Sequence, residues 1–145
     1  MNLFCIGLSH HTANVAMREQ FVGNATAESI VRNAACGEVL LLATCNRVEV
    51  YAVSAKRVST DEIARCLVRE TSSDPHYAPP FYRYEDEKCV QHLFRVASGL
   101  DSMVVGESEI FGQAKKAYEL ARTSGAVGPY LHRLFQRAFR VAKQV

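Results

Sequence analysis

The chain has 145 residues, of which 48% are hydrophobic and 22% are charged, and its formal net charge is +2. This composition is typical of a globular domain with its own core, and it excludes a disordered or fibrous chain. No apolar run approaches the roughly 20 residues of a membrane-spanning helix, and the N-terminus lacks the basic region of a signal peptide. We therefore expect a cytoplasmic protein with no membrane partner.

The first part of the chain alternates between strand and helix patterns. Strands are predicted where apolar side chains alternate or form short runs, and helices where a polar start precedes apolar residues at helical spacing. The predicted order is strand 3–9, helix 26–35, strand 38–43, strand 48–54, helix 59–71 and strand 81–84. This is the order of a split βαβ unit, so we expect an α+β fold. Its core would be a ferredoxin-like βαββαβ sandwich, an antiparallel sheet with its helices on one face.

Three more helices are predicted after this unit, over residues 86–98, 108–124 and 128–145. The last one begins at Gly128-Pro129, where a proline in the first turn loses no hydrogen bond. Its apolar stripe continues to Val145, and no glycine, asparagine or proline ends it. We therefore expect the natural protein to continue beyond this chain.

Charge is unevenly distributed along the sequence. From Gln113 onward, seven basic residues are accompanied by a single acid, Glu119. The seven are Lys115, Lys116, Arg122, Arg133, Arg137, Arg140 and Lys143. A polyanion would be drawn to this part of the chain, although a solvated helical face explains the same pattern.

Five cysteines, with no CxxC pair and no metal-ligand spacing to a histidine, indicate reduced thiols and no metal site. Cys5, Cys66 and Cys89 fall on apolar faces of predicted elements, where a cysteine is a small buried hydrophobe. Cys45 differs, because it lies in the polar stretch Thr44-Cys45-Asn46-Arg47 between two strands. It is the candidate nucleophile, and an inert buried thiol is the alternative.

Arg47 has two candidate tasks in this stretch. The thiolate is the reactive form of cysteine, and a free thiol with a pKa of about 8.5 is mostly protonated at neutral pH, so a nearby guanidinium would help. A planar guanidinium also pairs with a carboxylate in bidentate fashion. The two roles compete, and we favour carboxylate binding.

Histidines and one connector supply further candidates. His92 lies at the margin of a helical stripe, where it is either a capped or solvent-facing side chain or an acid or base for a thiol. His10 and His11 end a strand in a polar loop, and they either line a site or cap the strand. The connector over residues 101–109 is either a helix start with acids favoured by the dipole, or a recognition site for an amine or hydroxyl.

Five stretches together resemble a known family. They are GLSHHTA at residues 7–13, Arg18-Glu19, ATCNRVEVY at 43–51, HLFRVASGLDSMVVGE at 92–107 and IFGQAK at 110–115. The combination resembles glutamyl-tRNA reductase, the family that begins the C5 route to tetrapyrroles such as haem, over the whole chain in register. The resemblance implies a catalytic domain over residues 1–125 and the start of a long spinal helix over 126–145. NADPH-binding and dimerisation domains would lie outside this chain, in a V-shaped homodimer.

The resemblance also implies a reaction. Cys45 would attack the ester carbonyl of glutamyl-tRNA and form a thioester, which NADPH reduces to glutamate-1-semialdehyde. An aminomutase that takes this aldehyde is an expected partner, and no metal is implied. The sequence has no GxGxxG after a strand, so we expect NADPH to bind a domain outside this chain, which alone should not act as a reductase.

By matched position, the resemblance gives His92 a role in activity and places nine residues around the substrate. They are Thr44, Asn46, Arg47, Glu49, Ser102, Glu107, Ser108, Glu109 and Gln113. Asn14 stands where proline is more common in the family, and Glu109 stands where many members carry glutamine. The competing hypothesis is a non-catalytic ferredoxin-like module that binds tRNA or regulates another protein, with an inert Cys45.

Overall fold

The computed structural model describes residues 1–14, 18, 25–67, 81–101 and 109–144. Its strands are β1 (Asn2–Ser9), β2 (Glu38–Ala43), β3 (Arg47–Ser54) and β4 (Tyr82–Glu85). Its helices are α2 (Ala27–Ala34), α3 (Thr60–Leu67), α4 (Glu87–Ala97), α5 (Glu109–Thr123) and α6 (Pro129–Ala142). Each predicted strand and helix is present in these ranges. In this part of the chain, no helix is both long enough and apolar enough to cross a membrane.

The strands form one antiparallel sheet in the order β2-β3-β1-β4. β2 and β3 are joined by a short turn, and β1 lies between β3 and β4. A residue of β1 therefore has a partner on each side, and Gly7 is paired with both Glu49 of β3 and Tyr82 of β4. The prediction of a mixed α+β fold with an antiparallel sheet is confirmed.

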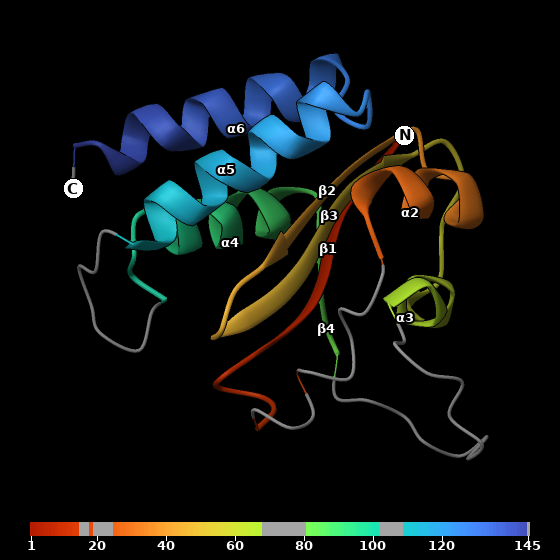
Figure 1. Cartoon of the computed structure of the whole chain (residues 1–145), viewed down its shortest axis with the longest axis horizontal. Helices are drawn as coiled ribbons and strands as arrows, with labels where there is room; N and C mark the ends of the chain where they lie inside the picture. Colours follow the sequence, from red (N-terminus) through yellow and green to blue (C-terminus); the bar gives the residue numbers. More distant parts are fainter. Residues whose placement is uncertain (15–17, 19–24, 68–80, 102–108, 145) are drawn as a thin grey trace.

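Helices cover both faces of the sheet (Figure 1). On one face, Ile30 of α2 and Ile63 of α3 belong to a core with Phe4, Ile6 and Val50 of the sheet. Strand residues alternate between the two faces, so their neighbours in sequence point the other way. The first two helices thus share one face of the sheet, as the sequence predicted.

The three C-terminal helices cover the opposite face, where the sequence analysis had not placed them (Figure 1). Leu93 of α4, Ala114 of α5 and Phe135 of α6 share one core with Leu40 and Tyr51 of the sheet. This second face also carries the polar side chains of β3, so α4 and α5 pack beside the candidate site.

The N-terminus of α6 is capped from β2. Glu38 accepts hydrogen bonds from the backbone amides of Gly128 and Leu131 at 2.8 Å each, and of Tyr130 at 3.3 Å. These amides have no partner within the helix, so the carboxylate satisfies them and complements the helix dipole. A Cβ at Gly128 would lie 2.8 Å from the Glu38 carboxyl carbon, so only glycine fits there without a shift.

The C-terminus of α6 lies at Ala142, earlier than the predicted run to Val145. The amide of Lys143 bonds to the carbonyl of Phe139, and that of Gln144 bonds to the nearer carbonyl of Val141. The last bond closes a tighter turn than an α-helix, which is common at helix ends. Val145 lies outside the described residues.

Candidate active site

The turn between β2 and β3 is built by Thr44. Its backbone amide donates to the carbonyl of Arg47 at 2.8 Å, which closes the turn. Its hydroxyl accepts from the amides of Asn46 at 3.1 Å and Arg47 at 3.2 Å. Threonine is suited to this role because its hydroxyl reaches backbone groups two and three residues ahead. The turn therefore holds Cys45 at its tip in a defined backbone conformation.

Cys45 is the one exposed thiol among the five described cysteines, all of which are free. Burial raises the pKa of the other four, to about 11 for Cys36 and about 12 for Cys89. Those thiols stay protonated at neutral pH, and a protonated thiol is a poor nucleophile. The structure therefore leaves Cys45 as the thiol that an external electrophile can reach.

Six of the predicted site residues meet in one small pocket. Four belong to the turn and two to the first turns of α5, and Ile110 completes the lining. The six are Thr44, Cys45, Asn46, Arg47, Glu109 and Gln113. Residues separated by more than 60 positions in the sequence are brought together because α5 packs against β2. The pocket offers a thiol, a hydroxyl, two amides, a carboxylate and a guanidinium to a polar ligand.

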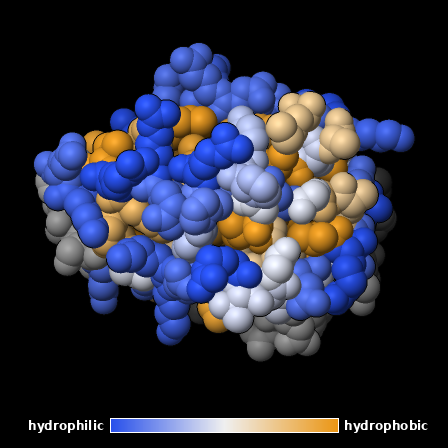
Figure 2. Space-filling view, turned by 90° about the horizontal axis from the view of Figure 1, so that it is seen from above, coloured by the Kyte–Doolittle hydropathy of each residue, from blue (hydrophilic) through white to orange (hydrophobic). Residues whose placement is uncertain are grey.

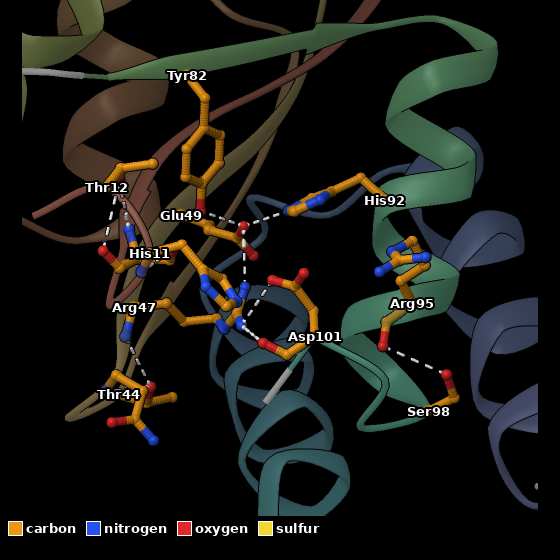
Figure 3. A network of polar contacts seen from close by, with 12 residues as sticks. His11, Thr12, Thr44, Arg47, Glu49, Tyr82, His92, Arg95, Ser98 and Asp101 are labelled. Atoms are coloured by element: carbon orange, nitrogen blue, oxygen red, sulfur yellow. Dashed lines mark hydrogen bonds and ion pairs between the residues drawn. The ribbon is translucent and has the colours of Figure 1, made fainter. Parts of the chain in front are cut away.

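Arg47 is almost fully buried, with 1% of its surface exposed. One guanidinium nitrogen, Nη2, donates to the backbone carbonyl of Asp101 at 2.9 Å and to its carboxylate at 3.0 Å. The other, Nη1, lies 3.4 Å from the carboxylate of Glu49. Burial alone would lower the pKa of Arg47, but the charges of Glu49 and Asp101 outweigh burial and raise it. Figure 3 shows the guanidinium between these two acids.

Glu49 is the centre of this network and has no exposed surface. Its carboxylate accepts hydrogen bonds from the hydroxyl of Tyr82 at 2.6 Å and from the imidazole of His92 (Figure 3). It also accepts from the hydroxyl of Tyr51 at 2.8 Å. Burial would raise the pKa of Glu49, but these donors and the Arg47 charge hold it below its ordinary value. The carboxylate is therefore ionised at neutral pH although it is buried.

Gly7 makes room for this carboxylate. Glu49 and Tyr82 flank Gly7 on neighbouring strands, so their side chains must meet above it. A Cβ at Gly7 would lie 2.6 Å from the carbonyl of Val48 and 2.8 Å from Cγ of Glu49. A glycine at this position is therefore a condition for the network to form.

His92 belongs to the network rather than to the turn. It is 8% exposed, and its ring stacks on Tyr84 with the centroids 4.5 Å apart. Its Nε2 is hydrogen bonded to Glu49, and no described contact joins it to Cys45. Within the part of the chain that the structure describes, His92 is linked to the turn through Glu49 and Arg47.

Three predicted site residues, Ser102, Glu107 and Ser108, lie outside the described residues. Two further residues of the site stand in stretches that the sequence singles out, Asp101 in the connector over residues 101–109 and Arg18 in Arg18-Glu19, but no partner was predicted for either. Asp101 accepts from Arg47, and the guanidinium of Arg18 donates to the carbonyl of Cys45 at 3.0 Å. Sequence reasoning missed Tyr82, which donates to Glu49. The partners of these three residues are 27 to 54 residues away in the sequence. The signal that could have found Tyr82 is the alternation of side chains along β4, which places it on the same face of the sheet as Glu49. This signal can be used only once the order of the strands is known.

Cys5, Glu49 and His92 lie close enough together to be considered as a metal site. One donor atom of each lies within 4.8 Å of the others, a set that could hold a metal ion. However, burial raises the pKa of Cys5 well above its ordinary value, and the carboxylate of Glu49 already accepts four donors. A guanidinium within 3.4 Å would also repel a cation. These features favour a hydrogen-bonded network at this position.

The side of the molecule formed by α5 and α6 is largely hydrophilic, with apolar patches between the polar groups (Figure 2). α6 contains no acidic residue, and its arginines at 133, 137 and 140 are exposed along one side. Among the described residues, no ion pair involves these three arginines. A basic strip therefore runs along α6.

The fold and the site define a class: an α+β domain with one exposed cysteine on a hydrogen-bonded turn, beside a buried arginine, glutamate and histidine network. The sequence profile of the family described as "Glutamyl-tRNAGlu reductase, N-terminal domain" matches residues 6–145. The chain belongs to the glutamyl-tRNA reductase family and corresponds to its N-terminal domain. The resemblance seen in the sequence is thereby confirmed.

Individual relatives agree with this assignment. The chain is 46% identical to a glutamyl-tRNA reductase of Xanthomonas oryzae pv. oryzae and 44% identical to one of Xylella fastidiosa, over 99% of its own length. Its fold is similar to that of glutamyl-tRNA reductase from Methanopyrus kandleri, with a TM-score of 0.80 and 34% identity over 98% of the chain. In each comparison the chain spans 33% of the relative's length.

Proposed function

We propose that the chain is the catalytic domain of a glutamyl-tRNA reductase and that Cys45 is its acyl acceptor. The observation that carries the proposal is the exposed thiol at the tip of a fixed turn, in a pocket with Thr44, Asn46 and Gln113. The thiolate sulfur forms a bond to the glutamyl carbonyl carbon, the bond from that carbon to the ribose oxygen breaks, and the departing ribose oxygen takes up a proton from solvent to become the hydroxyl of the free tRNA. An aminoacyl ester is already activated, so a thiolate suffices as nucleophile.

In this proposal Arg47 binds the side-chain carboxylate of the glutamyl group. Its guanidinium already holds one carboxylate, that of Asp101, at 3.0 Å. The substrate carboxylate replaces that of Asp101 there, because both are carboxylates that accept a hydrogen bond from the guanidinium. Tuning of the thiolate by Arg47 has less support, since none of the described bonds of the guanidinium is to Cys45.

His92 acts by position in this proposal. Its hydrogen bond to Glu49 helps to keep that carboxylate ionised, and Glu49 in turn orients Arg47. The polar residues Thr44, Asn46, Glu109 and Gln113 surround the substrate, and Ser102, Glu107 and Ser108 remain assigned to it by matched position. Their roles follow the family pattern.

The described residues do not fit NADPH. Every pairing in the sheet is antiparallel, whereas the dinucleotide site of a Rossmann fold needs a parallel strand, glycine-rich turn and helix. The reduction to glutamate-1-semialdehyde therefore belongs, in our proposal, to a domain outside this chain.

Further parts of the proposal concern the whole protein. The domain covers residues 1–125, residues 126–145 begin a spinal helix, and the full-length protein is a cytoplasmic homodimer that passes its product to an aminomutase. The sheet order supports a ferredoxin-like assignment for the first four strands and two helices. Each of these statements follows the family pattern.

Labelling the chain with glutamyl-tRNA carrying a radioactive glutamyl group tests the proposal. We expect label on the wild-type chain and on Cys66→Ser, a matched control at a half-buried thiol, and none on Cys45→Ser. Equal labelling of Cys45→Ser would refute the assignment of the nucleophile.

The basic strip on α6 favours a second candidate, a non-catalytic module that binds tRNA. Such a module predicts a Cys45 that does not react with glutamyl-tRNA and a tRNA affinity set by the arginines of α6. Incubation of the wild-type chain with labelled glutamyl-tRNA separates the two. Label on Cys45 favours the enzyme, and binding of tRNA without label on Cys45 favours the module.

A further inference from the structure

Arg18 is a buried cation that contacts the backbone of the candidate nucleophile. Only 6% of the surface of Arg18 is exposed. Nη1 donates to the carbonyl of Ala13 at 2.6 Å, and Nη2 donates to the carbonyl of Cys45 at 3.0 Å. The guanidinium therefore connects the segment that follows β1 to the turn between β2 and β3.

The bond from Arg18 completes the fixation of one peptide unit. The carbonyl of Cys45 and the amide of Asn46 belong to the same planar group. Arg18 holds its oxygen, and the hydroxyl of Thr44 holds its N–H at 3.1 Å. With both ends of the plane held, rotation of the backbone beside the Cα of Cys45 is restricted, and the direction of its side chain is restricted with it.

A third contact acts on the next peptide unit. The amide of His10 donates to the carbonyl of Asn46 at 2.9 Å. Two successive carbonyls of the turn, at positions 45 and 46, are thus both held by the chain that follows β1. The turn is supported from outside as well as by its own hydrogen bonds.

The position of Arg18 is costly for the fold. Among the described residues it is paired with no carboxylate, and its Nε has no hydrogen-bond partner. A buried donor without an acceptor opposes folding. The guanidinium is held in this position by two backbone carbonyls from separate segments of the chain, and one of them belongs to the turn that carries Cys45.

We propose that Arg18 is a positioning residue for Cys45, which keeps the sulfur aligned with the ester carbonyl of the substrate. The inference rests on the proposed function of Cys45 as acyl acceptor. Arg18 acts through the backbone and does not touch the reacting atoms. A displacement of the sulfur by about 1 Å is enough to slow such a reaction about 100-fold.

Two rates measured on the same protein separate positioning from a merely structural role. Acylation by glutamyl-tRNA needs an oriented thiol, whereas alkylation by iodoacetamide needs only an accessible one. For Arg18→Met, which keeps the length but removes every donor, we expect acylation to fall about 100-fold and alkylation to change by less than about threefold. Arg18→Lys, which reaches one carbonyl, should recover part of the acylation rate. Arg32→Met, at an exposed arginine of α2, is the matched control and should match the wild type.

The outcomes are distinct. Wild-type acylation rates in both Arg18 variants would overturn the inference while leaving Cys45 as acyl acceptor. A parallel loss of acylation and alkylation would also overturn it, because it indicates a disturbed fold. If Arg18→Met does not fold, Arg18→Lys decides by the same two rates. Absence of acylation in the wild type refutes the proposed function, and this inference with it.

Discussion

Glu49 shows how one buried carboxylate organises the site at the level of single residues. The side chain is fully buried, yet its hydrogen-bond donors and Arg47 hold its pKa below the ordinary value for a glutamate. The carboxylate is therefore charged at neutral pH, and the guanidinium of Arg47 balances that charge. A group whose pKa is lower in the folded than in the unfolded protein stabilises the fold above its unfolded pKa. That stabilisation is lost as the pH falls through the lower, folded value.

Glu49→Gln should therefore destabilise the protein at pH 7 by about 2 kcal/mol, because it removes one partner of a buried ion pair while Asp101 still balances Arg47. The difference from wild type should shrink as the pH falls below the ordinary pKa of a glutamate and through the lower pKa of the folded protein, where the wild-type carboxyl also becomes neutral. Urea unfolding followed by circular dichroism at several pH values measures this. The matched control, Glu28→Gln in an exposed pair with Arg32, should change stability by less than about 0.5 kcal/mol at any pH. A difference for Glu49→Gln that does not depend on pH would contradict the account.

Gly7→Ala tests the space that the network needs. The added Cβ would lie 2.6 Å from backbone at Val48, so a central strand pair must shift, and we expect a loss of about 2 kcal/mol together with slower acylation of Cys45. At Gly37 the nearest atom to such a Cβ is 3.6 Å away, an ordinary contact. Gly37→Ala should therefore keep both stability and acylation, measured by thermal unfolding and by labelling. Equal effects at the two glycines would show that the close contact at Gly7 is unimportant.

At the scale of elements, the helices were predictable because each buries one side with a regular spacing, and the hairpin because two apolar runs flank a short polar stretch. The turn from Thr44 to Arg47 was recognisable as a site because four polar residues interrupt two apolar strands. The partners of that turn were not recognisable. Tyr82 reaches Glu49 across 33 positions and Asp101 reaches Arg47 across 54, and periodicity contains no information on pairings at such distances.

The cap of α6 by Glu38 is another such long-range pairing, and it gives a prediction at this scale. Glu38→Ala removes the acceptor of three helix amides and should cost about 1 to 2 kcal/mol of unfolding free energy. Glu87 lies in the first turn of α4, is exposed and has no described hydrogen bond, so Glu87→Ala should cost less than about 0.5 kcal/mol. Urea denaturation of both variants compares them. Similar losses would mean that the cap contributes only through the helix dipole.

At the scale of the molecule, the two faces of the sheet differ: one packs an apolar core, and the other carries the candidate site. α2 and α3 cover one face of the sheet around an apolar core, and α4, α5 and α6 cover the other face (Figure 1). The polar network around Glu49 lies on this second face. The basic strip of α6 lies on the outside of this second layer. Composition predicted the excess of bases in this third of the chain, but only the packing of α6 decides which of them face outward together.

Replacing Arg133, Arg137 and Arg140 by glutamine should weaken binding of glutamyl-tRNA without changing the alkylation of Cys45. We expect the slope of log affinity against log salt concentration to fall by about 3, one for each lost phosphate contact. Filter binding across a salt series measures this slope. Arg32→Gln, on α2 at the opposite face, should leave it unchanged. An unaltered slope in the triple variant would show that the basic strip of α6 does not bind tRNA.

Peptide mapping by mass spectrometry shows directly whether the thiol of Cys45 accepts the glutamyl group. The chain is incubated with glutamyl-tRNA, quenched in acid, digested and searched for glutamyl adducts. We expect one adduct, on the peptide that contains Cys45, and its release by hydroxylamine, as a thioester requires. A Cys45 peptide free of glutamate while tRNA is bound, or an adduct on Cys66 instead, would contradict it.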